Sequence, residues 1–265
     1  MDHPIIKEAL AKADCALGLK RRIVGVTFLF TEEEFERAEA KRLKARIPYC
    51  VMVKRATRGH TAKATLENFG CRAAARALGL MAPEELFTSG RHYQRLGLYR
   101  DLGVAKNIRQ NMTLCRHQAL GVMIKPLADH REPAHVVLLV GEPYQMMRIV
   151  QAYTYHYGYQ TRFQTAGNQA LCSECTAHVF ENNTINHSLL CAGTRFMAGW
   201  DDTEMAVGFP FGMLENIVDG LYATLNPTEP DRKKRRIEKR MKEEKREDLE
   251  IEYGRNYYTG LYLSP

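Results

Sequence analysis

Ile23-Val24-Gly25-Val26-Thr27-Phe28-Leu29-Phe30 is a short apolar run rich in β-branched and aromatic residues. Such a run predicts a buried strand. Thr31 follows it, with three glutamates behind, which is typical of a helix N-cap and an acidic first turn. We therefore expect a helix over residues 32–46, ended by Pro48.

Three further apolar runs have the same character. They predict strands at residues 119–124, 135–140 and 205–209. Helices are expected at residues 143–157 and after Pro210, because apolar side chains recur there at helical spacing. Strands that alternate with helices predict an α/β (or α+β) fold in one layered domain.

The composition excludes several classes of protein. The chain has 265 residues, of which 45% are hydrophobic and 26% charged, as in a globular domain. It has no apolar stretch long enough for a membrane helix, and its Met1-Asp2-His3-Pro4 start does not resemble a signal peptide. A cytoplasmic location is expected, where seven cysteines indicate metal ligation or core packing and not disulfides.

The C-terminal residues 227–265 differ from residues 1–226. Between residues 229 and 252 there are ten Lys or Arg and nine Asp or Glu, which predicts a charged helix. Because these charges nearly balance, a nucleic-acid partner is not expected. We expect this helix to be solvated or to lie on another subunit in a homo-oligomer, followed by a tyrosine-rich strap.

The cysteines are spaced in two similar pairs. Twenty residues separate Cys50 from Cys71, and eighteen separate Cys172 from Cys191. Each pair follows a predicted strand and helix, so we expect two similar halves, at about residues 10–118 and 119–226, with the pairs at equivalent positions. Pro48 and Asn68 predict helix starts close to the first pair, where free N–H groups and the helix dipole favour thiolates.

This spacing leaves three interpretations open. Four cysteines brought together by the fold are compatible with an iron–sulfur cluster. Zinc sites usually have short C-x₂₋₄-C knuckles, and the chain has one, Cys172-Ser-Glu-Cys175, with no second. Cys175 is an alternative ligand to Cys172. Buried cysteines can also serve as small hydrophobic residues, which is the role expected of Cys15 and Cys115.

Charged residues beside the cysteines are candidates for orienting a substrate or supporting a cluster. They are Arg72 and Arg195, and Glu204 in the loop that follows. Arg195 and Glu204 are equally explained by a salt bridge across that loop. Dinucleotide-binding, P-loop, serine-hydrolase and zinc-protease motifs are absent from the sequence.

The chain resembles the uncharacterised family called domain of unknown function 169. The resemblance covers residues 10–225 and rests on several segments, among them Pro48-Tyr-Cys50, Asn68-Phe-Gly-Cys71, Leu190-Cys-Ala-Gly-Thr-Arg195 and Asp202-Thr-Glu-Met-Ala-Val-Gly-Phe-Pro210. Members of the family have cysteines at the places of Cys50, Cys71 and Cys191, commonly with one near Cys172, and occur mainly in anaerobic bacteria and archaea. The resemblance thus implies a ligand set and no reaction.

These observations lead to one functional expectation. We expect a 4Fe-4S cluster bound by Cys50, Cys71, Cys172 and Cys191, in a redox protein, oxidoreductase or lyase. Its partner would be a small anionic substrate or an electron-transfer protein. The alternatives are a non-catalytic redox sensor and a structural zinc protein.

Overall fold

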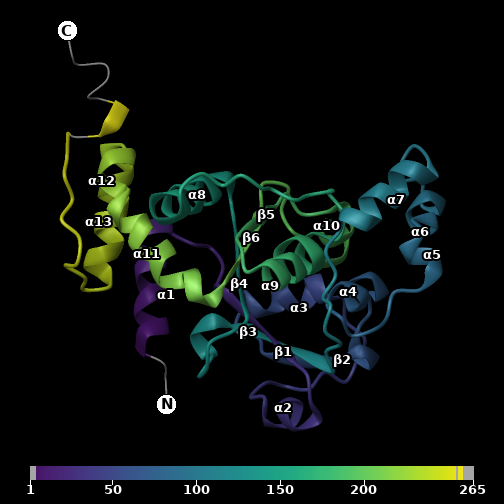
Figure 1. Cartoon of the computed structure of the whole chain (residues 1–265). Helices are drawn as coiled ribbons and strands as arrows, with labels where there is room; N and C mark the ends of the chain where they lie inside the picture. The colour runs from purple at the N-terminus through teal and green to yellow at the C-terminus, as the bar shows by residue number, and fades with distance from the viewer. Residues whose placement is uncertain (1–3, 255, 259–265) are drawn as a thin grey trace.

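The computed structural model describes residues 4–254 and 256–258. Within these residues, α-helices flank a six-stranded sheet with the order β2-β3-β1-β4-β6-β5 (Figure 1). All neighbouring strands pair antiparallel, which confirms a mixed α/β domain. The strands are β1 (Val24–Leu29), β2 (Ala62–Thr65), β3 (Gly121–Pro126), β4 (Val136–Gly141), β5 (Asn186–Ser188) and β6 (Met205–Pro210).

The helices precede, connect and follow these strands. They are α1 (Pro4–Leu17), α2 (Glu32–Arg37), α3 (Tyr49–Ala56), α4 (Arg72–Ala77), α5 (Glu85–Thr88), α6 (Arg91–Arg95), α7 (Leu102–Asn111), α8 (Pro143–Tyr157), α9 (His178–Asn182), α10 (Ala192–Ala198), α11 (Leu214–Ala223), α12 (Leu225–Thr228) and α13 (Asp231–Glu243), with a π-helix, η3 (Ala170–Ala177). Among the helices of the described ranges, none combines the length and the apolar character needed to cross a bilayer.

The connectivity of the sheet is repeated. The first three strands lie in the order β2-β3-β1, and the last three lie in the order β5-β6-β4. The first strands of the two sets, β1 and β4, pair antiparallel at the centre of the sheet. A rotation of 180° about an axis between these two strands therefore exchanges the two sets. The change from one set to the other falls between β3 and β4. The division into halves at residues 118 and 119 stays a prediction.

Each face of the sheet carries its own core. Val24, Val26 and Phe28 of β1 belong to the core shared with α3, α4, η3 and α9. The opposite face of β4 and β6 packs against α1, α8 and α11. Burying both faces of the central strands explains why these strands are continuous apolar runs in the sequence.

The helix expected over residues 32–46 ends much earlier. Thr31 forms the predicted capping box with Glu34, but α2 stops at Arg37. Two lysines from the sheet bind carbonyl groups at this end: Lys63 Nζ donates to Phe35 O and Glu36 O, and Lys125 Nζ to Glu39 O. These tertiary contacts satisfy carbonyls that a longer helix would have used internally.

The charged C-terminal helix packs within its own chain. Ile237 and Met241 of α13 are buried with Cys15 of α1, and Figure 1 shows α13 and α1 side by side. Arg240 Nε donates to Cys15 O at 2.8 Å, which satisfies a carbonyl at the end of α1. The prediction of a helix that is solvated or lies on another subunit is therefore wrong for this apolar face. Tyr262 of the predicted strap lies outside the described residues.

Two buried histidines should make the protein sensitive to mild acid. Burial lowers the pKa of His130 and of His187 from 6.5 to about 4. Between pH 6.5 and 4 these histidines are protonated in the unfolded chain but stay neutral in the folded protein. The free energy of unfolding therefore falls as the pH drops towards 4. At pH 5 each histidine should reduce the free energy of unfolding by about 2 kcal/mol. Urea unfolding at pH 7.5 and pH 5 measures this loss. In H187Q the decrease in the free energy of unfolding between pH 7.5 and pH 5 should be smaller by the contribution of His187. A decrease as large as that of the wild type would contradict the expectation.

Candidate functional site

Four cysteines enter one region from four separate elements. Cys50 lies in the first turn of α3, Cys71 is the N-cap of α4, Cys172 lies in η3 and Cys191 is the N-cap of α10. Helix α3 packs against α10 and η3, and α4 packs against η3. The four cysteines belong to the core on one face of the sheet, with Cys71 at its half-buried margin.

The thiols are close enough to affect one another electrostatically. Burial is the largest influence on Cys50, and with the negative charge of Cys71 and Cys191 it raises the pKa to about 12. Burial also raises the pKa of Cys172, and Cys71, Cys191 and Cys50 raise it further. Such interactions fall off with distance, so the four side chains lie within electrostatic range of one another.

Thr194 joins two of the thiols. The Cys191 thiol donates to Thr194 Oγ1 at 3.2 Å, and its sulfur accepts from the Thr194 N–H at 3.3 Å. The Thr194 hydroxyl also hydrogen-bonds Cys50 and opposes the rise of its pKa. Cys71 has no side-chain hydrogen bond within its cap. The expectation that Asn68 caps this helix is wrong, because Asn68 ends a separate 3₁₀ turn and Cys71 is the cap.

The π-helix separates the two cysteines of the CxxC motif. All eight residues of η3 are buried, and Gln169 before it has a left-handed φ of 54°. The Cys175 sulfur faces Asn186 O at 3.9 Å, and Glu174 is the charged group that adds to the effect of burial on its pKa. Gly208 of β6 permits this close packing, because a Cβ there would lie 2.0 Å from Cys175 O. Cys172, and not Cys175, therefore lies in the group of four thiols.

The four thiols can be compared with two kinds of metal site. Around one tetrahedral zinc ion, thiolate sulfurs lie about 3.8 Å apart. Within residues 4–254 and 256–258, no three His, Cys, Asp or Glu side chains are arranged to hold one metal ion. In a 4Fe-4S cluster each thiolate binds a different iron at a corner of the cube, so the sulfurs are more widely spaced. Four convergent thiols fit such a cluster in their number and chemistry.

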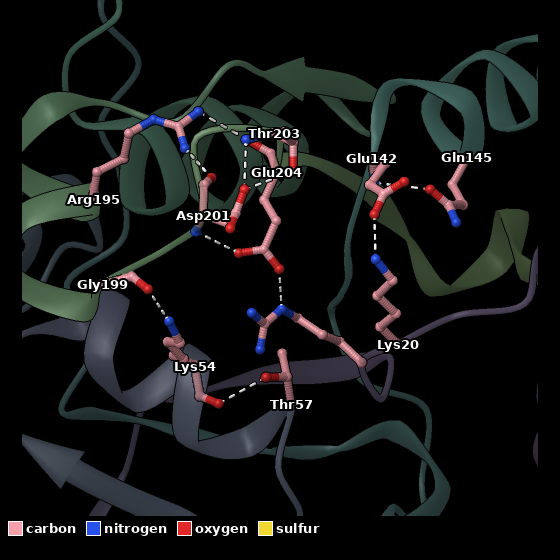
Figure 2. Close-up of polar contacts among 11 residues, drawn as sticks. Lys20, Lys54, Thr57, Glu142, Gln145, Arg195, Gly199, Asp201, Thr203 and Glu204 are labelled. Atoms are coloured by element: carbon pink, nitrogen blue, oxygen red, sulfur yellow. Dashed lines mark hydrogen bonds and ion pairs between the residues drawn. The ribbon is translucent and has the colours of Figure 1, made fainter.

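The predicted charged residues have different surroundings. Arg195 donates to the main-chain carbonyls of Leu189 at 2.8 Å, Glu204 at 3.0 Å and Asp201, and so fixes the loop after α10 (Figure 2). The Glu204 carboxylate accepts from the Asp201 N–H at 2.8 Å and pairs with Arg21. Arg195 and Glu204 thus meet through the main chain, and not as the salt bridge considered from the sequence. Arg72 is exposed at the start of α4.

The same loop is attached to the Cys50 helix by residues that the sequence did not single out. Lys54, one turn after Cys50, donates to Gly199 O (Figure 2). Trp200 contacts two cations, with Lys54 Nζ and the Arg21 guanidinium each 4.9 Å from the centroid of its ring. Gly199 has a φ of 61°, which glycine adopts at little cost. These contacts attach the C-terminal end of α10 to α3, the helix that carries Cys50.

Metal-free protein should show an order of thiol reactivity. Cys71 is half-buried, whereas Cys50 and Cys172 are 5% and 8% exposed and have raised pKa values. A raised pKa keeps a thiol protonated at pH 8, and the protonated form does not react with iodoacetamide. We expect Cys71 to be alkylated first, as measured by peptide mass spectrometry after short pulses. Equally rapid modification of Cys50 would contradict this order.

Comparison with known proteins assigns the chain to a family whose activity is not described. Residues 13–220 match the family model described as DUF169, "Uncharacterised ArCR, COG2043". The chain is 30% identical over 159 residues to "Uncharacterized protein MJ0308" of Methanocaldococcus jannaschii, which covers 60% of this chain and 68% of that protein. No solved structure matches the chain.

Proposed function

Because the chain belongs to the DUF169 family, which is described as uncharacterised, we propose its function from its own residues. It binds a 4Fe-4S cluster through Cys50, Cys71, Cys172 and Cys191 and serves as a redox protein. The observation that carries this proposal is that four cysteines from four separate elements lie in or against one core and within electrostatic range of one another.

The electrostatics of the thiols support a cationic centre among them. Burial and mutual repulsion disfavour thiolates at Cys50 and Cys172 when nothing positive lies between them. Iron reverses this preference, because metal binding displaces the thiol protons. The free N–H groups at the starts of α3, α4 and α10 then face negative charge, which they favour.

The repeated topology supports a shared site. Cys50 lies between β1 and β2, and Cys172 lies between β4 and β5. Cys71 follows β2, and Cys191 follows β5. Each set of three strands therefore supplies one cysteine from before and one from after its second strand. A cube with four equivalent corners suits four ligands arranged in this way.

The number of ligands determines what the site does. With four protein thiolates every iron is saturated, and the cluster supplies one-electron transfer. The half-buried position of Cys71 favours a second candidate, in which one iron corner is open to solvent. An open iron acts as a Lewis acid, so that this second candidate is a reductase or lyase acting on a small anionic molecule.

Metal and sulfide analysis of oxygen-free material tests the proposal. Protein purified anaerobically should be brown and contain about four iron and four sulfide per chain. Electron paramagnetic resonance after dithionite reduction should give a signal typical of a reduced 4Fe-4S cluster. Colourless protein with stoichiometric zinc, or protein that retains neither iron nor sulfide after anaerobic reconstitution, would refute the cluster.

A further inference from the structure

One half of a sheet face carries polar side chains beside a small apolar cluster, where the other half is apolar throughout. On β4 and β6 this face presents Val137, Leu139, Val207 and Phe209 to the core under α1, α8 and α11. On β1 and β3 the same face carries Thr27 and Lys125, as their register with Met123 and Gly25 shows. Helix α2 lies beside β1 at the lower edge of Figure 1, away from α8 and α11.

A cavity of about 560 Å³ lies over this polar half. Its lining includes Thr27, Met123, Lys125, His130 and His135, with residues of α2 at one side. The cavity is several times larger than the roughly 150 Å³ cavity that holds one benzene molecule. It therefore has room for a small organic molecule.

The polar groups of this cavity have unused hydrogen-bonding capacity. Lys125 is 3% exposed, and within the described part of the chain its ammonium donates once, to Glu39 O at 3.2 Å. His130 is also 3% exposed and interacts with the backbone of Gly25 and Lys125, whereas Thr27 Oγ1 has no hydrogen-bond partner among the described residues. Native proteins rarely leave buried polar groups unsatisfied, so such groups at one cavity indicate a ligand.

The glycine opposite Lys125 makes room for this arrangement. Gly25 pairs with Lys125 across the strands, and a Cβ at Gly25 would lie 2.4 Å from His130 Nε2. The imidazole therefore lies directly on the β1 backbone, next to the lysine. Any larger residue at position 25 would displace it.

Glu39 and Asp129 attract the Lys125 ammonium electrostatically, but within the described part of the chain neither carboxylate forms an ion pair with it. Glu39 pairs with Arg131 at 2.5 Å, and Glu34 Oε2 accepts from the Phe30 N–H at 2.6 Å. Glu132 also lines the cavity and is exposed. Because a partly unpaired ammonium is costly to bury, an anion beside Lys125 would be strongly favoured.

We propose that this cavity is a binding site for a small organic anion, whose carboxylate or phosphate group binds Lys125, Thr27 and His130. The site lies on the face of the sheet opposite the four thiols and does not depend on the cluster. It is distinct from the residues around Cys191 that the sequence suggested for an anion.

Two anions and one conservative variant test the site. We expect phosphate or succinate to stabilise the purified protein thermally above sodium chloride at equal ionic strength. In ¹³C-methyl methionine NMR, the Met123 signal, assigned with M123L, should shift with the anion. K125Q should weaken binding about tenfold because it removes the positive charge, and T27V should weaken it a few-fold because it removes one hydroxyl donor.

Lys63 provides a matched control. It is a buried lysine on the neighbouring strand, on the same face, but its ammonium donates to Phe35 O at 2.6 Å and Glu36 O at 3.0 Å. K63Q should bind the anion as the wild type does. A response to phosphate alone assigns a phosphate ligand, and a response to succinate alone assigns a carboxylate. No response to either anion, or equal loss in K63Q and K125Q, would overturn the proposal.

Discussion

Replacing Cys172 with serine should abolish retention of iron and sulfide by anaerobically purified protein, whereas C175S should retain both. The two residues lie within one turn of η3, yet the negative charge of Cys50, Cys71 and Cys191 acts on Cys172. Cys175 faces Asn186 O and responds to Glu174. Iron and sulfide should fall from about four per chain to below one in C172S.

C175S is a close control because both variants place a hydroxyl in a buried position of the same helix. A general disturbance of η3 would lower iron retention in both proteins. Circular dichroism should show both variants folded. Retained cluster in C172S together with loss in C175S would instead make Cys175 the ligand. If both variants retain iron, neither cysteine of η3 is a ligand.

The remaining ligands distinguish the two proposed functions. C50S and C191S should lose the cluster, because both residues are buried and hydrogen-bond Thr194. If all four cysteines bind iron, C71S should behave in the same way or leave a damaged cluster. Wild-type iron and sulfide in C71S, with unchanged electron paramagnetic resonance, would show that Cys71 is not a ligand. That result would favour an open iron and hence the reductase or lyase.

The sequence predicted those elements whose signals are local. β1, β4 and β6 are buried apolar runs, and α8 has the predicted bounds of residues 143–157. The early end of α2 was not predictable, because Lys63 binds a carbonyl of α2 and Lys125 binds one just after it, both from strands distant in the chain. The three-residue β5 also lacks an apolar run, since it reads Asn186-His187-Ser188.

The candidate site was predictable in part, because some of its signals are local in the sequence and others depend on contacts between distant residues. Repeated spacing indicated Cys50, Cys71, Cys172 and Cys191, and the fold brings all four together. The choice between Cys172 and Cys175 depends on a π-helix whose N-cap, the buried Gln169, has a left-handed backbone conformation. Glutamine has no intrinsic preference for that conformation, so its cause lies in tertiary packing, and η3 packs against α9, β5, β6 and α4.

The Arg148→Met substitution should destabilise the fold by about 3–5 kcal/mol. Arg148 of α8 and Glu229 are each 1% exposed, and their Nε and Oε1 atoms are 3.1 Å apart. The guanidinium also donates to Leu221 O and to Thr228 Oγ1, each at 2.7 Å, and so joins α8 to the ends of α11 and α12. Removing it leaves the Glu229 carboxylate buried without a cation. The free energy of unfolding in urea measures the loss.

A double substitution separates the cost of an orphaned charge from the value of the pair. R148M/E229M removes both charges, so it should recover much of the stability lost in R148M, because paired burial of ions gains little over apolar contacts. The exposed pair of Lys239 and Glu243, 3.8 Å apart, is the control, and K239A should change stability by less than about 0.5 kcal/mol. If the double variant is instead as unstable as R148M, the hydrogen bonds to Leu221 and Thr228, and not the charge of Glu229, hold this junction together.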